Sequence, residues 1–237
     1  MNRKYKNAMI ASAVATTVAA TGALVYLGEN FIGPFRFLHV DKVARKNPKK
    51  YYQNGVVFYG ASNFRLWTDM KDDLAPYKVA NSGIGEATDK DLVQYADKLL
   101  YNYNPNIVVF QTGSNNYIKA KGNVDEIVKS CMLYKQYMFT LFHEKLPDTK
   151  FVVLSGLLLP GRHDYLDITI KVNYQLQKFC EEHSDFMTYV DCDSLTYQDK
   201  TYRDSLFLKN GYHLNRAGQV EWANKYIKPV LDEIAQN

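Results

Sequence analysis

The chain has 237 residues, of which 46% are apolar and 23% are charged, values typical of one globular domain rather than a disordered chain. The net charge of +4 is concentrated at the start: three of the 29 basic residues, Arg3, Lys4 and Lys6, precede every acid, and the remaining 26 face 25 acidic residues. The body therefore lacks the basic field that nucleic-acid binding needs, and we expect no nucleic-acid partner.

A long uncharged stretch follows these basic residues. It runs from Ala8 to Gly28, close to the roughly 20 residues that span the hydrocarbon core of a bilayer. A cleaved signal peptide has a shorter apolar region, about 7 to 15 residues. Residues 1–28 are therefore predicted to form an uncleaved signal anchor, with a cleaved signal peptide as the alternative. The body is expected outside the cell membrane, either on a single-pass anchor or secreted.

Residues 29–53 are predicted to form a stalk or linker, because they show little periodicity and contain Gly33-Pro34 and Asn47-Pro48. They also hold a basic cluster, which the positive-inside tendency would keep in the cytoplasm. A cytoplasmic body is therefore a further alternative. The cluster consists of Arg36, Lys42, Arg45, Lys46, Lys49 and Lys50.

From residue 54 onward, strand-like runs at 55–59, 77–80, 107–111, 151–155 and 187–190 alternate with amphipathic segments. Helices are expected from Thr88, from about Val124, and from a cap at Asn215. This alternation predicts one α/β domain over 54–237, a three-layer α/β/α sandwich with a roughly five-stranded parallel sheet. In such a domain, functional residues gather at the loops that follow the carboxyl ends of the strands.

Three polar residues occupy informative loops. Ser62 follows the first strand and begins a helix, where it either acts as a nucleophile or caps the helix. Asn115 follows the third strand, where its amide either donates to an oxyanion or shapes a turn. His213 precedes the last helix; a lone histidine is more often structural. A serine hydroxyl needs such a base within hydrogen-bond reach to attack an ester carbonyl.

Taken together, four blocks resemble the SGNH hydrolases, also called the GDSL esterase and lipase family. The resemblance covers about residues 54–235 and is closest to the branch of platelet-activating-factor acetylhydrolase subunits and related acetyl esterases. The blocks are Gly60-x-Ser62-x-x-Arg65-x-Trp67 after the first strand, Asn81-x-Gly83-x-Gly85 after the second, Gly113-x-Asn115 after the third, and His213-Leu214-Asn215 before the last helix. The run Leu146-Pro147-Asp148-Thr149-Lys150 before the fourth strand is also similar to that branch.

The resemblance implies a flavodoxin-like SGNH fold and a serine esterase that uses neither metal nor cofactor. It implies Ser62 as nucleophile, His213 as general base with Asn210 as its supporting residue, and an oxyanion hole from Asn115 and the backbone amides of Ser62 and Glu86. The expected substrate is a small acyl ester, an O-acetyl group of an extracytoplasmic glycan or a lipid ester. The alternatives are an O-acyltransferase, and a catalytically weak or inactive domain that binds glycan or a partner protein.

Four positions depart from the family pattern, and three of them, Ala61, Glu86 and Asn210, motivate the weak or inactive alternative. The most consequential is Asn210, which stands where the family has an Asp, so that the imidazole is oriented without a carboxylate charge. Asp164 or Asp204 is a candidate for the missing acid. The other three departures are Ala61 for Asp, Glu86 for Gly and Asn116 for Asp.

The remaining reactive side chains show no metal-ligand spacing, and we predict no metal site. Cys131 lies on the apolar face of a predicted helix and is expected to be a buried thiol. A disulfide between Cys180 and Cys192 is an open alternative.

Overall fold

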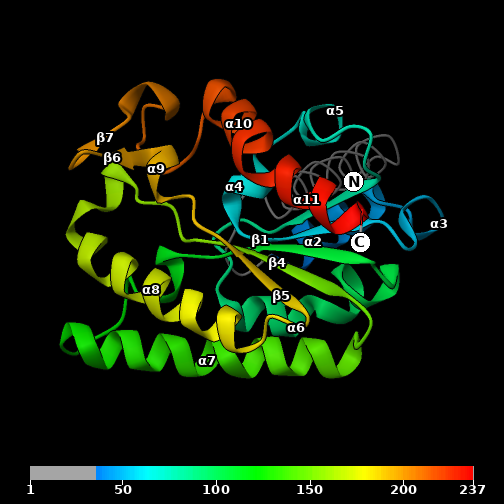
Figure 1. Ribbon diagram of the computed structural model, residues 1–237, viewed down its shortest axis with the longest axis horizontal. Helices are drawn as coiled ribbons and strands as arrows, with labels where there is room; N and C mark the ends of the chain where they lie inside the picture. The colour runs from blue at the N-terminus through cyan, green and yellow to red at the C-terminus, as the bar shows by residue number, and fades with distance from the viewer. Residues whose placement is uncertain (1–35, 237) are drawn as a thin grey trace, which may run out of the picture.

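The computed structural model describes residues 36–236, and the predicted signal anchor at 1–28 lies outside this range. Five parallel strands form one sheet in the order β2-β1-β3-β4-β5, which confirms the predicted α/β sandwich (Figure 1). The strands are β1 (Val56–Gly60), β2 (Val79–Gly83), β3 (Ile107–Gln111), β4 (Lys150–Leu154) and β5 (Met187–Val190). A small antiparallel hairpin, β6 (Tyr197–Gln198) and β7 (Thr201–Tyr202), lies apart from the sheet.

Helices cover both faces of this sheet (Figure 1). One layer contains α2 (Arg36–Lys46), α6 (Asp89–Leu99), α7 (Val124–Lys145) and α8 (Leu166–Glu182). The opposite layer contains α4 (Ser62–Arg65), α5 (Met70–Asp73), α9 (Asp193–Thr196), α10 (Arg216–Trp222) and α11 (Lys228–Gln236), the last two joined by a π-helical turn at Ala223–Ile227.

The strands are apolar throughout because each contributes to two cores. Successive side chains of a strand point to opposite faces. In β1, Val57 and Tyr59 join the core under α6, α7 and α8, whereas Val56 and Phe58 join the core under α4 and α10. A parallel strand buried on both sides therefore has no polar face, which is why continuous apolar runs predicted these strands.

One strand differs from its prediction. β2 begins at Val79, and it continues through the polar residues Asn81 and Ser82 to Gly83 rather than ending at Ala80. Its pairing with β1 extends to Gly60 and Gly83, because main-chain hydrogen bonds do not depend on side-chain polarity. Apolar patterning alone ends the strand too early.

The predicted helix starts are confirmed by their caps. Thr88 accepts a hydrogen bond from the backbone of Asp91, and the Asp91 carboxylate accepts one from the backbone of Thr88, which completes a capping box. The Asn215 side chain accepts from the backbone N–H of Gly218 at the start of α10. These caps set where α6 and α10 begin, and both helix starts flank the loops described below.

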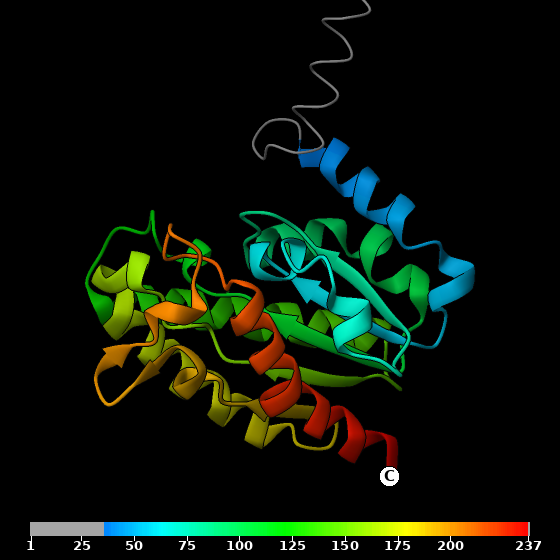
Figure 2. The same cartoon turned by 90° about the horizontal axis from the view of Figure 1, so that it is seen from above.

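Within the range predicted as a stalk or linker, residues 36–46 and 49–52 are helical, and α2 packs against the domain. α2 is followed by α3 (Lys49–Tyr52), and Val40 and Val43 of α2 are buried in the core. Asn47 donates from Nδ2 to the carbonyl of Asn81 in β2 at 2.7 Å. Figure 2 shows α2 on the β2 side of the sheet, against α6. No helix within residues 36–236 is both long and apolar enough to cross a membrane.

Candidate active site

Ser62 is presented by a sharp turn between β1 and α4. It is the first residue of α4, so its backbone N–H has no acceptor within the helix and faces outward with the helix N-terminus. The turn is close-packed: a Cβ on Gly60 would lie 2.2 Å from the carbonyl oxygen of Gln111, and one on Gly83 would lie 2.3 Å from the backbone nitrogen of Arg65. Gly60 therefore allows the close approach of β3, and Gly83 allows α4 to pack against the end of β2.

His213 reaches the same turn from the loop before α10. Leu214 donates its backbone N–H to Oδ1 of Asn63 at 3.1 Å, and Leu208 donates to the carbonyl of His213 at 2.8 Å. These two hydrogen bonds fix the position of the loop, and Nε2 of His213 lies 3.0 Å from Oγ of Ser62. Residues 151 positions apart in the chain thus form a hydrogen-bonded serine–histidine pair.

Asn210 occupies the opposite side of the imidazole, with Nδ2 at 3.0 Å from Nδ1 of His213. Its amide orientation follows from a second contact, because Tyr212 donates its backbone N–H to Oδ1 at 2.9 Å. An amide NH₂ group only donates, so Nδ1 is the acceptor and the ring proton resides on Nε2, facing Ser62. A general base needs the other tautomer, in which Nε2 accepts.

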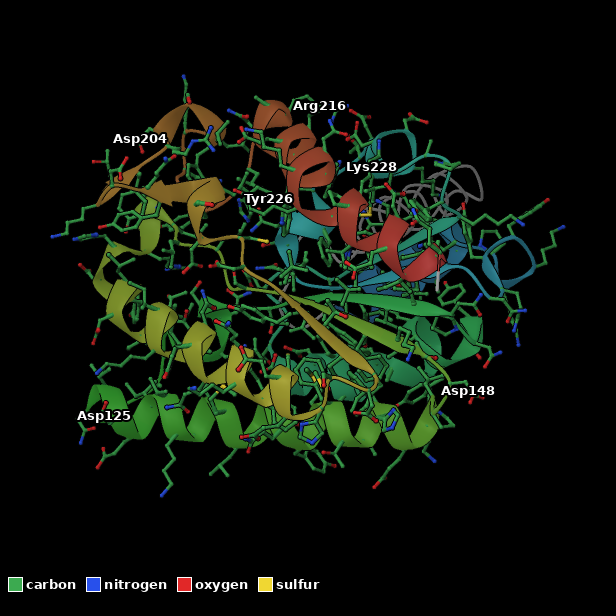
Figure 3. The ribbon with its side chains drawn as sticks, viewed as in Figure 1. Asp125, Asp148, Asp204, Arg216, Tyr226 and Lys228 are labelled. Carbon is green, nitrogen blue, oxygen red and sulfur yellow. The ribbon has the colours of Figure 1, made fainter. Side chains whose placement is uncertain are left out.

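The charges around His213 also disfavour its protonated form. Burial lowers the pKa of its imidazole, and the positive charges of Arg65 and Arg162 lower it further. Among residues 36–236, no carboxylate contributes to this shift in the pKa of the ring. Asp164 is exposed in the loop after β4, and Figure 3 shows Asp204 on the outer loop beside the β6–β7 hairpin. Neither supplies the acid that the sequence lacks, and both alternatives are wrong.

The predicted oxyanion donors line the same pocket. Asn115 lies in a 3-10 turn after β3 and donates one N–H of its amide to the carbonyl of Ala87 at 3.1 Å, which leaves the second N–H for a ligand. Glu86 adopts φ 51°, a left-handed conformation that glycine takes most easily. Its side chain is exposed and the residue lines the pocket, so Glu86 holds here the backbone conformation that a glycine would adopt most easily.

A buried ion pair supports the Asn115 loop from below. Lys135 of α7 is 1% exposed and lies 3.2 and 3.1 Å from the two carboxylate oxygens of Asp89, also 1% exposed. Lys135 also donates to the hydroxyl of Thr112, directly after β3. Asn116 accepts the backbone N–H of Asp89 at 2.8 Å. The departure at Asn116 thus ties the start of α6 to the loop that carries Asn115.

The pocket between these groups has a volume of about 240 Å³. Besides the predicted residues, it is lined by Arg162, whose guanidinium lies 4.5 Å from the centre of the Tyr212 ring, and by Leu157 and Leu159. Sequence reasoning missed Arg162 and also Asn63 of α4, which accepts the backbone N–H of Leu214, because no local pattern distinguishes either residue from its neighbours.

The remaining predictions about cysteines and metals concern groups away from this pocket. Cys131, Cys180 and Cys192 are all buried free thiols, so the disulfide alternative is wrong. Burial raises the pKa of the Cys192 thiol to about 12 and that of Cys131 to about 11, which makes both unreactive near neutral pH. Among residues 36–236, no cluster of His, Cys, Asp and Glu has the geometry of a metal site.

No protein-family model and no curated protein matches the chain. Solved structures are similar. A GDSL-like lipase from Bacteroides thetaiotaomicron matches with a TM-score of 0.64 at 18% identity, over 82% of this chain and 98% of that one. A protein named as a platelet activating factor from Streptococcus pneumonia matches with a TM-score of 0.61 at 16% identity, over 89% and 97%. A lipase/acylhydrolase from Enterococcus faecalis matches with a TM-score of 0.54 at 18% identity, over 72% and 96%. The chain therefore has the fold of the GDSL-like lipases and acylhydrolases, as its motifs predicted.

Proposed function

We propose that the chain is an SGNH-type serine esterase that hydrolyses a small acyl ester. The observation that carries this proposal is the 3.0 Å contact between Oγ of Ser62 and Nε2 of His213 at the carboxyl edge of a parallel sheet. Asn115 and the backbone amides of Ser62 and Glu86 surround the same pocket. A nucleophile, a base and a set of oxyanion donors are the parts that acyl transfer requires.

In the reaction, neutral His213 must first adopt the tautomer in which Nδ1 carries the ring proton, so that Nε2 is free to accept. The hydroxyl of Ser62 then attacks the ester carbonyl while Nε2 takes its proton. The negative charge that develops on the carbonyl oxygen is stabilised by the amide of Asn115 and the backbone N–H groups. The imidazolium then returns its proton to the leaving alcohol, and an acyl-enzyme forms on Ser62. Water, activated by the same imidazole, hydrolyses the acyl-enzyme and restores the serine.

The size of the pocket favours short acyl groups. Its volume of about 240 Å³ lies below the range of roughly 300–1,000 Å³ that is common for drug-sized ligands. An acetyl group with part of its alcohol fits such a space, and a long acyl chain does not. We therefore propose an O-acetyl ester, borne by a glycan or a lipid and reached on the outer side of the membrane if residues 1–28 act as an anchor.

A second candidate function is supported by Asn210. Its amide stabilises the tautomer in which Nε2 carries the proton, and Arg65 and Arg162 oppose the imidazolium that turnover creates. These features suit a slow esterase, or a domain that binds an ester or glycan without hydrolysing it.

The two candidates differ in the reactivity of Ser62. Purified full-length protein is assayed with p-nitrophenyl acetate and p-nitrophenyl octanoate, with Ser62→Ala as the control. The esterase proposal predicts turnover of the acetate ester that the variant lacks, and a weaker rate with the octanoate. Labelling by a fluorophosphonate reports nucleophilicity independently. A wild-type protein that neither turns over the acetate nor becomes labelled at Ser62 supports the binding-only alternative.

A further inference from the structure

A second pocket lies on the far side of α4 from the serine, between α2 and α5. It has a volume of about 420 Å³, and four cationic side chains line it: Lys42, Lys46, Arg65 and Lys71. No acidic residue of the described range lines it. We call it the basic pocket. It shares no lining residue with the catalytic pocket, so the two sites can be tested separately.

The acids on the elements around the basic pocket are engaged elsewhere. Asp41 of α2 pairs with Lys98. Asp69, just before α5, and Asp73, at its end, pair with Arg216, which Figure 3 shows at the start of α10. Asp72 is exposed and does not line the pocket. None of these four carboxylates therefore lines the basic pocket.

Arg65 makes this imbalance energetically significant. Its side chain is partly buried, none of the hydrogen bonds or ion pairs within residues 36–236 involves its guanidinium, and its Nε is buried without an acceptor. Burial lowers the pKa of Arg65, and the negative charge of Glu86 opposes that shift. A desolvated charge without a partner is unfavourable, and an anion in the adjoining pocket would offset that penalty.

The two lysines at the rim complete the arrangement. Lys46 is exposed and, like Arg65, takes part in no ion pair of the described range. Lys71 donates only to the hydroxyl of Tyr52 and lies 4.6 Å from the centre of its ring, so it too has no carboxylate partner. Lys46 of α2, Arg65 of α4 and Lys71 of α5 thus all line the basic pocket.

We propose that the basic pocket binds a phosphate group, either of a small phosphate ester or of an anionic lipid headgroup. A phosphate presents several strong acceptor oxygens in different directions and carries up to two charges, which suits donors that approach from α2, α4 and α5. A carboxylate, with one charge and one plane of acceptors, would satisfy fewer of them. The proposal does not depend on the esterase activity, because it concerns a different pocket.

Binding is measured by calorimetry on the full-length chain carrying Ser62→Ala, at constant ionic strength. The probes are inorganic phosphate, glycerol 3-phosphate, and monomeric dihexanoyl phosphatidylglycerol, with dihexanoyl phosphatidylcholine and citrate for comparison. The test variant is Lys46→Gln/Lys71→Gln, which changes two surface side chains and leaves the core intact. The matched control is Lys129→Gln/Lys178→Gln, which removes the same charge from exposed positions on α7 and α8.

We expect saturable binding of at least one phosphate probe, weakened about tenfold or more in the test variant and unchanged in the control, because each lost charge-assisted contact lowers affinity several-fold. Binding of glycerol 3-phosphate identifies a small phosphate ester as the ligand. Binding of phosphatidylglycerol alone identifies a lipid headgroup. The proposal is overturned if no phosphate probe binds, if the test and control variants bind equally, or if citrate binds more tightly than every phosphate.

Discussion

Replacing Asn210 by Asp should increase esterase activity. The substitution keeps the shape of the side chain, and Tyr212 can still donate its backbone N–H to one carboxylate oxygen. The other oxygen then faces Nδ1 of His213, where Nδ2 now lies at 3.0 Å. A carboxylate oxygen accepts a hydrogen bond from a protonated Nδ1, so this tautomer is stabilised and Nε2 becomes free to accept the proton of Ser62.

The magnitude depends on how well solvent screens the new charge. Two unit charges 4 Å apart interact by about 1 kcal/mol in water and about 4 kcal/mol near a protein surface. Asn210 is exposed, so the lower half of this range applies. Stabilising the imidazolium by about 1.4 to 2.8 kcal/mol raises kcat/KM roughly 10- to 100-fold. In a serine protease triad, where the Asp is buried, the reverse change costs about 10⁴.

The assay is p-nitrophenyl acetate hydrolysis from pH 5 to 9, compared with wild type and with Asn106→Asp. The latter makes the same change of side chain and charge at the opposite edge of the sheet, next to the start of β3. We expect Asn210→Asp, and not Asn106→Asp, to raise kcat/KM and to move the midpoint of the acidic limb of the pH profile to higher pH. An unchanged or lower rate in a protein that retains fluorophosphonate labelling would refute this reasoning and indicate a site built around the amide.

Three further outcomes are expected. Burial and two arginines lower the pKa of His213, and only the neutral ring accepts a proton, so wild-type kcat/KM should rise with pH to a plateau with a midpoint below the ordinary value of 6.5. Arg162→Gln should move that midpoint to higher pH. A wild-type midpoint above 6.5 would contradict the role of His213 as the general base in this environment. Asn115→Ala should lower kcat about 10²- to 10³-fold with little change in KM, and a purely higher KM would argue against an oxyanion role. Lys135→Met should lower the free energy of unfolding by about 3–5 kcal/mol in urea denaturation, because it leaves Asp89 buried without its cation. The double variant Lys135→Met/Asp89→Leu should recover most of this loss. Equal losses in both variants would contradict the explanation.

Several features of the site follow from local sequence alone. Some requirements of the site are local: glycines where two backbone segments approach closely, a serine in the first turn of a helix, and an asparagine cap before the last helix. The sequence therefore indicated where Ser62, Asn115 and His213 lie along the chain. The apolar strands were equally predictable, because a parallel strand covered on both faces has no polar side. The prediction failed in β2 beyond Ala80, where polar side chains occur in a strand that still pairs with its neighbour. Strand pairing continues there because main-chain hydrogen bonds do not depend on the side chains.

The long-range contacts were decided by the tertiary structure. Sequence predicted that Asn210 supports His213, and the contact that orients its amide is local, with the backbone N–H of Tyr212 two residues along the chain. Only the fold brings the hydroxyl of Ser62 to the other nitrogen of the ring. The packing of residues 36–52 against the sheet was missed, because a short helix with few apolar residues becomes stable only when Val40 and Val43 find a core that distant segments build. Arg65 shows the same division: its place in the motif was visible, but only the assembly of α2, α4 and α5 buries its Nε without an acceptor among residues 36–236. The sequence by itself thus determined the strands, the turns and the order of the reactive residues. Tertiary structure alone decided the protonation and charge of the site, because those depend on groups brought together from opposite ends of the chain.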